Sequence, residues 1–288
     1  MRHTHRLLVL GALSLCTYCA IAQRAETFPR VSLPETEVRY LRSSIVGDEF
    51  EISIALPPNY RSSNTAYPVL YVTDANVLFA AMTQITRGML QPGIEELPPI
   101  LLVGIGYRID SLIQWARLRS RDLTPTTVPD PFPTGGAPLF MRFIKEELMP
   151  FIRQNYKTSS DAAYAGYSYG GICGLYVLFH EPELFQRYLI ASPWMSHDSL
   201  ITLKYESGYA SKHSDLPARV FMSVGGFEET QGTVTEVGIV SNMKLLADRL
   251  LNRRYPNFFL KTHVFEGETH LSGGVAAMSR GLRVLYGK

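Results

Sequence analysis

Tyr164-Ala165-Gly166-Tyr167-Ser168-Tyr169-Gly170-Gly171 is the stretch that decides the expected fold, because it places a serine between glycines. The apolar run before it, 162–165, suits a buried strand, and the run after it, 172–179, suits a buried helix. Glycines at 166 and 170 leave room for the strand and the helix to cross closely, while a strained backbone at the serine holds Oγ clear of the main chain. The stretch therefore predicts a strand-turn-helix unit that presents Ser168 as a nucleophile. A plain turn is the alternative.

The first 22 residues have the order of a secretory signal. Arg2 and Arg6 precede an apolar run at 7–15, and Ala20-Ile21-Ala22 supplies the small residues of a cleavage site. The run is too short for a permanent transmembrane helix, which needs about 20 apolar residues. We therefore expect a signal peptide at 1–22, one domain at 23–288, and a periplasmic or secreted location after cleavage near Ala22.

Charge and cysteine content narrow the class of protein. The 288 residues carry a net charge of +2, and removal of residues 1–22 would leave 266 residues with no net charge. A balanced charge gives no basic field for phosphate backbones, so we expect no nucleic-acid partner. Of the three cysteines only Cys173 would remain, so the mature chain has no intrachain disulfide. Cys173 is expected to be a small buried apolar residue.

Eight short segments have the composition of strands. The first two, near 38–41 and 49–56, suit a hairpin, and the second alternates polar and apolar residues as a strand with one solvated face does. Six further apolar runs do not alternate and suit strands buried on both faces: 68–72, 100–105, 162–165, 188–191, 220–224 and 260–265. Helices are expected at 77–89, 139–156, 172–179, 234–251 and about 273–285. This order predicts an α/β-hydrolase fold, an eight-stranded, mostly parallel sheet with helices on both faces.

The segment 107–136 fits no regular element, because it is rich in Pro, Thr and Arg. We interpret it as a long loop that forms a lid or substrate wall. The side chains of this segment that could contact a ligand are Trp115, Arg117, Arg119 and Arg121. We predict that Trp115, Arg119 and Arg121 contact the substrate, since guanidinium groups hold anions through charge-assisted hydrogen bonds. The alternative is that Arg121 pairs with Asp122 or another carboxylate and only fixes the loop.

A serine hydroxyl needs a base to activate it and an acid to orient that base. In the expected fold the chain order is serine, acid, histidine, with the acid after a late strand and the histidine after the last one. The strand at 220–224 is followed by Glu228 and Glu229, and the strand at 260–265 by His270. We predict His270 as the base and Glu228 as the acid. Glu229 and Asp198 remain alternatives for the acid.

Two backbone N–H groups must stabilise the oxyanion that forms during acyl transfer. The residue after the nucleophile, Tyr169, supplies the first. The loop after the strand near 69–72 supplies the second, for which we predict the Asn76 amide, with Ala75 as the alternative. The histidines of the mature chain show no metal-ligand spacing, so we expect no metal and no cofactor.

Taken together, these segments resemble the esterase family of α/β-hydrolases, and within it the siderophore trilactone esterases that act on enterobactin. The similarity covers nearly all of 23–288 in order. The matching motifs are Tyr67-Pro68-Val69-Leu70-Tyr71-Val72-Thr73-Asp74, Ala165-Gly166-Tyr167-Ser168-Tyr169-Gly170-Gly171, Glu183-Leu184-Phe185 through Ala191-Ser192-Pro193, Val224-Gly225-Gly226-Phe227-Glu228 and Glu266-Gly267-Glu268-Thr269-His270. The resemblance implies Ser168 as nucleophile, His270 as base and Glu228 as acid. Two positions depart from it: Ala75 stands where many relatives have glycine, and Tyr167 where histidine is common.

The sequence thus predicts an exported serine carboxylesterase that works through an acyl-enzyme. A ferric catecholate trilactone is one anionic ester that the arginine-rich segment would suit. An acyltransferase, or an esterase that removes acyl or feruloyl groups from glycans, would use the same three residues, and both remain open. The alternative from another class is a non-catalytic ligand-binding protein on the same scaffold. The oligomeric state is not addressed by the sequence.

Overall fold

The computed structural model describes residues 31–93, 95–230 and 238–287. The expected signal peptide at 1–22 lies outside the described residues, and so do the start of the expected domain, 23–30, and the start of the helix expected at 234–251. The folded unit runs from Leu33 to Lys288.

Eight strands form one sheet, in the order β1-β2-β4-β3-β5-β6-β7-β8. The strands are β1 (Thr36–Arg42), β2 (Glu49–Ala55), β3 (Tyr67–Val72), β4 (Leu101–Tyr107), β5 (Thr158–Tyr167), β6 (Arg187–Ala191), β7 (Arg219–Gly225) and β8 (Phe259–Phe265). β2 pairs antiparallel with β1 and with β4, and every other pairing is parallel. The predicted hairpin and the six parallel strands after it are therefore confirmed.

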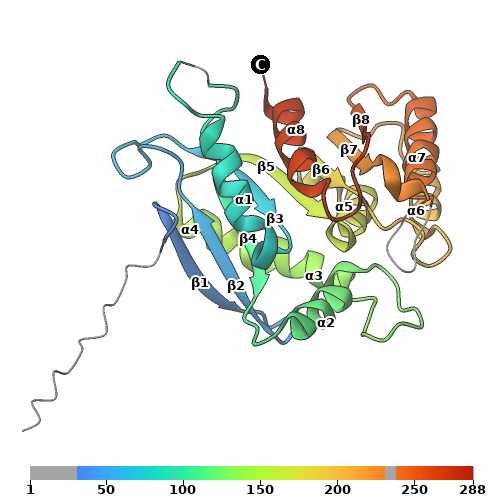
Figure 1. Cartoon of the computed structure of the whole chain (residues 1–288), viewed down its shortest axis with the longest axis horizontal. Coiled ribbons are helices and arrows are strands. Elements are labelled where there is room, and N and C mark those ends of the chain that lie inside the picture. Colours follow the sequence, from blue (N-terminus) through green and yellow to red (C-terminus); the bar gives the residue numbers. More distant parts are fainter. Residues whose placement is uncertain (1–30, 94, 231–237, 288) are drawn as a thin grey trace, which may run out of the picture. The chain divides into compact units, whose positions relative to one another are not determined.

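Helices cover both faces of this sheet (Figure 1). They are α1 (Ala75–Gly88), α2 (Leu112–Leu123), α3 (Ala137–Phe143), α4 (Met149–Asn155), α5 (Tyr169–His180), α6 (Ile201–Ala210), α7 (Ile239–Arg253) and α8 (Gly274–Tyr286). One apolar core holds the buried residues of α1 and α8, and a second holds those of α3 to α7 on the opposite face. α3 and α4 are joined by a π-helical turn, Ile144–Leu148, so the helix expected at 139–156 is one continuous helical stretch. No helix in the described part of the chain is long and apolar enough to span a bilayer.

The burial of the strands follows their composition. All seven residues of β4 are buried, as its unbroken apolar run predicts. β2 alternates only over its first half, and from Ile52 onward both of its faces are buried. The expected solvated face of β2 is therefore wrong for its second half, because helices cover the sheet on both sides there.

The interpretation of 107–136 as a structureless loop is wrong. β4 continues to Tyr107, and α2 then occupies twelve residues of the segment. The Ser111 side chain caps α2 by accepting a hydrogen bond from the Gln114 N–H at 3.2 Å. Serine followed three residues later by glutamine is a helix-start signal that the Pro and Thr content of the segment obscured. α6 was not predicted either.

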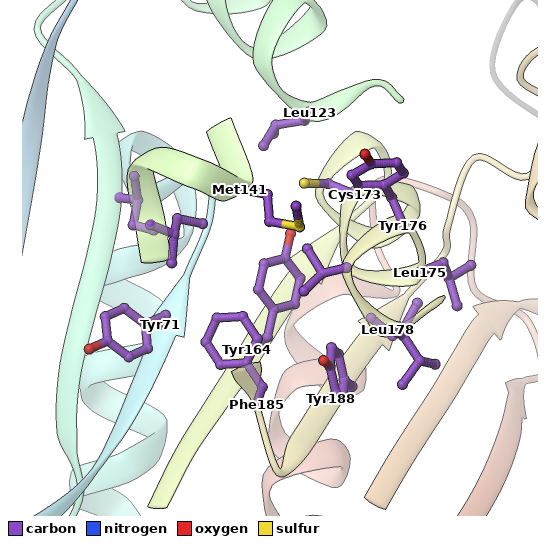
Figure 2. Close-up of a cluster of buried hydrophobic side chains, with 14 of the residues drawn as sticks. Tyr71, Leu123, Met141, Tyr164, Cys173, Leu175, Tyr176, Leu178, Phe185 and Tyr188 are labelled. Atoms are coloured by element: carbon purple, nitrogen blue, oxygen red, sulfur yellow. The ribbon is translucent and has the colours of Figure 1, made fainter. Parts of the chain in front are cut away.

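Tyr164 of β5 connects the core to the turn that carries Ser168. Figure 2 shows its ring among Tyr71, Phe185 and Tyr188 in the buried cluster, and its centroid lies 5.5 Å from that of Phe185. Its hydroxyl donates a 2.7 Å hydrogen bond to the Gly170 carbonyl in the first turn of α5. The core thus supports the start of α5 directly.

Candidate active site

Ser168 lies at a sharp turn between β5 and α5. Its backbone has φ 58° and ψ −115°, a region that non-glycine residues rarely adopt. A Cβ at position 166 would collide with the Gly170 carbonyl, and a Cβ at position 170 would collide with the Thr73 side chain. Both glycines are therefore required by close approach, and the predicted strand-turn-helix unit is confirmed.

The last residue of β6 and the segment after it hold the backbone of this turn. The Ser168 N–H donates to the Ala191 carbonyl at 3.0 Å, and the Trp194 N–H donates to the Ser168 carbonyl at 3.3 Å. Both main-chain polar groups of the strained residue are therefore bonded, which offsets part of the cost of its conformation. Strain kept in this way is typical of functional sites.

Glu228 follows β7 and His270 follows β8, as the chain order predicts, and their side chains are in contact. His270 Nδ1 lies 2.6 Å from Glu228 Oε2. The Glu228 carboxylate is fully buried. Its other oxygen accepts hydrogen bonds from Ser192 Oγ at 2.7 Å and from the Gly225 N–H at 2.6 Å. With three donors around it, this carboxylate can orient an imidazole and stabilise it when it becomes charged.

Glu229, the alternative acid, faces away from His270. Its carboxylate accepts hydrogen bonds from the hydroxyl and the N–H of Ser241, at the start of α7. These bonds hold the pKa of Glu229 below its ordinary value. Of the two adjacent carboxylates, the structure brings only Glu228 to the histidine.

Tyr167, the residue before Ser168, contacts the loop that carries His270. Its hydroxyl donates to the His270 carbonyl, and the two rings lie 5.1 Å apart between centroids. Burial raises the pKa of Tyr167 well above its ordinary value, so the hydroxyl keeps its proton. The contact therefore links the turn that carries Ser168 to the loop that carries His270.

A cavity of about 580 Å³ opens beside Ser168 and His270. It is lined by Asp74, Val77, Leu78, Trp115, Arg119, Tyr167, Ser168, Tyr169, Trp194, His270, Leu271, Gly274 and Val275. Its lining is mostly apolar and aromatic, with a few polar groups, as in small-molecule sites generally. Four of the predicted site residues besides Ser168 therefore share one cavity: His270, Tyr169, Trp115 and Arg119.

Arg119 lines the cavity but is already paired. Its Nε and one Nη each donate to an oxygen of Asp74 at 2.8 Å, and only 12% of its side chain is exposed. Its guanidinium lies 4.8 Å from the Trp115 ring and 4.7 Å from the Tyr169 ring. Burial alone would lower the pKa of Arg119, but the neighbouring Asp74 carboxylate raises it. The arginine is thus a fixed cation whose charge Asp74 neutralises.

The structure does not place Arg121 in the cavity. Its guanidinium pairs with Asp122 at 2.7 Å and with Asp48 at 3.1 Å. These ion pairs favour the alternative, a residue that fixes its own segment, and a contact of Arg121 with the substrate stays a prediction. Two residues apart on one helix point in different directions, since each residue turns by about 100°.

Asn76 lies in the first turn of α1, and its side chain closes onto the end of β4. Its amide donates to the Tyr107 carbonyl at 2.8 Å, and its carbonyl accepts from the Tyr107 N–H at 2.9 Å. Neither Asn76 nor Ala75 is among the residues that line the cavity. Their backbone amides, and that of Tyr169, stay predictions for the oxyanion site.

Sequence reasoning missed Trp194, Ser192 and the role of Asp74. Trp194 and Ser192 follow the carboxyl end of β6, the edge where open parallel sheets place their ligands. That position was a usable signal for both. The pairing of Asp74 with Arg119 spans 45 residues, and no local pattern indicates it.

Comparisons with known proteins find related esterases. The model of the family described as "Putative esterase" matches residues 43–215, more than half of the chain. The ferri-bacillibactin esterase BesA of Bacillus subtilis is 29% identical over 266 residues, which cover 88% of this chain and 90% of that protein. The siderophore triacetylfusarinine C esterase of Aspergillus fumigatus is 28% identical over 280 residues, which cover 89% and 94%.

Solved structures show the same architecture. An IroE-like serine hydrolase from Shewanella oneidensis superposes with a TM-score of 0.77 at 26% identity, covering 86% of this chain and 79% of that one. Together with the strand order, this likeness confirms the predicted α/β-hydrolase fold.

Proposed function

The chain belongs to the esterase family of carboxylic ester hydrolases, and on that premise we propose that it cleaves its ester through Ser168, His270 and Glu228. The observation that carries this proposal is the 2.6 Å contact between His270 Nδ1 and the buried Glu228 carboxylate. The histidine of this pair lines the same cavity as the strained Ser168. A buried acid, a histidine and a nucleophile that lines the cavity are the parts that serine esterases need.

In the first half of the reaction, Ser168 Oγ attacks the ester carbonyl and His270 Nε2 takes the hydroxyl proton. Glu228 holds Nδ1–H and stabilises the imidazolium that forms. His270 then gives the proton to the departing alcohol, which leaves an acyl group on Ser168. The Tyr169 N–H, as the first amide of α5, would stabilise the negative charge on the carbonyl oxygen.

In the second half, water replaces the alcohol. His270 takes a proton from water as its oxygen attacks the acyl carbon, and then returns that proton to Ser168 Oγ as the acid departs. The chain's own residues complete both halves. An alcohol in place of water would make the same chemistry an acyl transfer.

For the substrate we propose an ester of the siderophore class. The support is that both relatives above are named for siderophore ester cleavage and align over nearly 90% of this chain. The cavity is large enough for one aromatic arm of such a molecule, since drug-sized ligands occupy about 300–1,000 Å³.

We also propose that the protein is exported and loses residues 1–22. The support is the sequence of that segment, with Arg2 and Arg6 before an apolar run and Ala20-Ile21-Ala22 after it. Mass spectrometry of protein recovered outside the cytoplasm should find Gln23 at the N-terminus. An intact Met1 in that fraction would contradict export through a cleaved signal.

The catalytic assignment is tested with p-nitrophenyl butyrate and with enterobactin, in its ferric and metal-free forms. Ser168→Ala should lower kcat by several orders of magnitude, on the order of 10⁶ as in a serine protease. Glu228→Gln should lower it by up to about 10⁴, because the imidazole loses its orienting carboxylate. Glu229→Gln is the matched control and should stay within about twofold of the wild type, since Glu229 contacts Ser241 instead.

Two outcomes would overturn parts of the proposal. Wild-type rates in Ser168→Ala would show that the turn is not catalytic and favour a ligand-binding protein. Formation of a new ester when an alcohol is added, at the expense of free acid, would show a transferase.

A further inference from the structure

One wall of the cavity is a row of stacked groups from three elements. The Trp194 ring stacks on the Tyr169 ring, with centroids 4.5 Å apart and planes at 18°. The Arg119 guanidinium lies 4.7 Å from the Tyr169 centroid and 4.8 Å from the Trp115 ring. All four side chains line the cavity that contains Ser168. We call this row the stacked wall.

The remaining side chains around the cavity are largely apolar. Val77 and Leu78 come from α1, Val275 from α8 and Leu271 from the residue after His270. Val77, Leu271 and Val275 are half or more exposed, and they mark the mouth. Exposed apolar side chains gathered at a cavity mouth indicate contact with an apolar ligand surface.

The cavity carries no free positive charge among the described residues that line it. Arg119 is the one lysine or arginine there, and Asp74 neutralises it through two hydrogen bonds of 2.8 Å. The buried Glu228 behind His270 adds a negative charge nearby. Because the Arg119–Asp74 pair carries no net charge, an anionic ligand would find no unpaired cation among these residues and would lie near the negative charge of Glu228.

We propose that the stacked wall binds an uncharged aryl group of the ester, so that the site selects neutral aryl esters over aliphatic and anionic ones. This inference rests on the proposed function. A flat ring on the face of Trp194 or Trp115 gains from stacking beyond the area it buries, and a saturated ring of similar size does not. If the substrate is a siderophore, the site should therefore prefer the metal-free molecule, whose rings are neutral, to its anionic ferric complex.

Three ethyl esters that share one leaving alcohol separate ring type from charge: ethyl benzoate, ethyl cyclohexanecarboxylate and monoethyl terephthalate. We expect kcat/KM for the benzoate to exceed that for the cyclohexane ester by roughly 3- to 10-fold, the range of an aromatic pair. It should exceed that for the anionic terephthalate by at least about tenfold. The kcat/KM for metal-free enterobactin should likewise exceed that for the ferric complex.

Variants tie these ratios to the wall. Trp194→Leu should bring the benzoate to cyclohexane ratio close to one while ethyl acetate is still hydrolysed, and Trp194→Phe should restore most of the ratio. Tyr205→Leu, on α6, is a control aromatic that does not line the cavity and should leave the ratios unchanged. Circular dichroism checks that each variant is folded.

The proposal fails if the terephthalate monoester or the ferric complex is the better substrate. It also fails if Trp194→Leu lowers the rates of all esters equally, or if ethyl benzoate is not cleaved by an enzyme that hydrolyses p-nitrophenyl butyrate. Failure of the proposed function looks different, because Ser168→Ala would then keep wild-type rates on every ester.

Discussion

The turn between β5 and α5 and the helix α2 both line the cavity but are specified in different ways. The turn depends on backbone geometry: glycines at 166 and 170, and the positive φ of Ser168. α2 depends on side-chain pairs with distant residues, namely Arg119 with Asp74 and Arg121 with Asp48. Backbone requirements leave a local signature in the sequence, whereas distant pairs leave none. Backbone constraints thus position the reactive Ser168. Ion pairs between distant residues position the α2 part of the cavity wall.

The largest expected effect comes from breaking the turn itself. Gly166→Ala would push a Cβ into the Gly170 carbonyl, and overpacking of this kind costs about 1–3 kcal/mol or more. We expect a loss of activity of at least 100-fold together with a lower midpoint of thermal unfolding. Activity and calorimetry measured on one preparation check both.

Gly208→Ala in α6 is the matched control for that change. A Cβ at 208 meets nothing within 4 Å, and alanine is the better helix former by about 1 kcal/mol. This variant should be fully active and slightly more stable. Equal damage by both substitutions would show that close packing at the turn is not what matters.

The next largest effect is expected from removing Arg119 from the stacked wall. Arg119→Ala leaves the Asp74 carboxylate buried without its partner, which costs about 3–5 kcal/mol. Because Asp74 begins the helix α1 beside the cavity, we expect a large loss of kcat/KM as well as of stability. Urea unfolding and steady-state kinetics measure the two.

Arg121→Ala is the comparison variant for Arg119→Ala, because it breaks an ion pair on the same helix but away from the cavity. It also strands a buried carboxylate, Asp122, so stability should fall. Activity of the folded fraction should stay within about threefold of the wild type. If this variant loses activity as Arg119→Ala does, then α2 acts on the site as a whole and not through Arg119.

A smaller effect tests the link between the turn and the base. Tyr167→Phe removes the hydroxyl that donates to the His270 carbonyl. The loss of one such hydrogen bond is worth about 1 kcal/mol, so kcat should fall roughly 5- to 10-fold with KM unchanged. An unchanged kcat would leave Tyr167 with a purely structural role.

The smallest effect concerns Cys173 in α5. Burial raises the pKa of its thiol to about 12, so the thiolate is scarce at any assay pH. The native protein should not react with a thiol reagent, and the reagent should not change activity. The urea-unfolded protein serves as the positive control and should react at once.

The same contrast explains what the sequence predicted. Strand order, the Ser168 turn and the positions of Glu228 and His270 follow from apolar runs and from what comes after each run. α2 was misread although Ser111 and Gln114 carry a capping signal, because Pro and Thr content outweighed it. The ion pair of Arg121 with Asp48 could not be predicted, because the two residues lie 73 positions apart in the sequence. Only the folded chain shows that partner.

The ion pair between Arg119 and Asp74 has a consequence for how substrate reaches Ser168. Swinging α2 outward would separate two buried charges, which costs several kcal/mol, so the wall does not act as a lid. Substrate would therefore enter past Val77, Leu271 and Val275 without a movement of α2. Such an enzyme has no opening step to trigger, and its rate on esters gathered in micelles should show none of the interfacial activation that lidded lipases display.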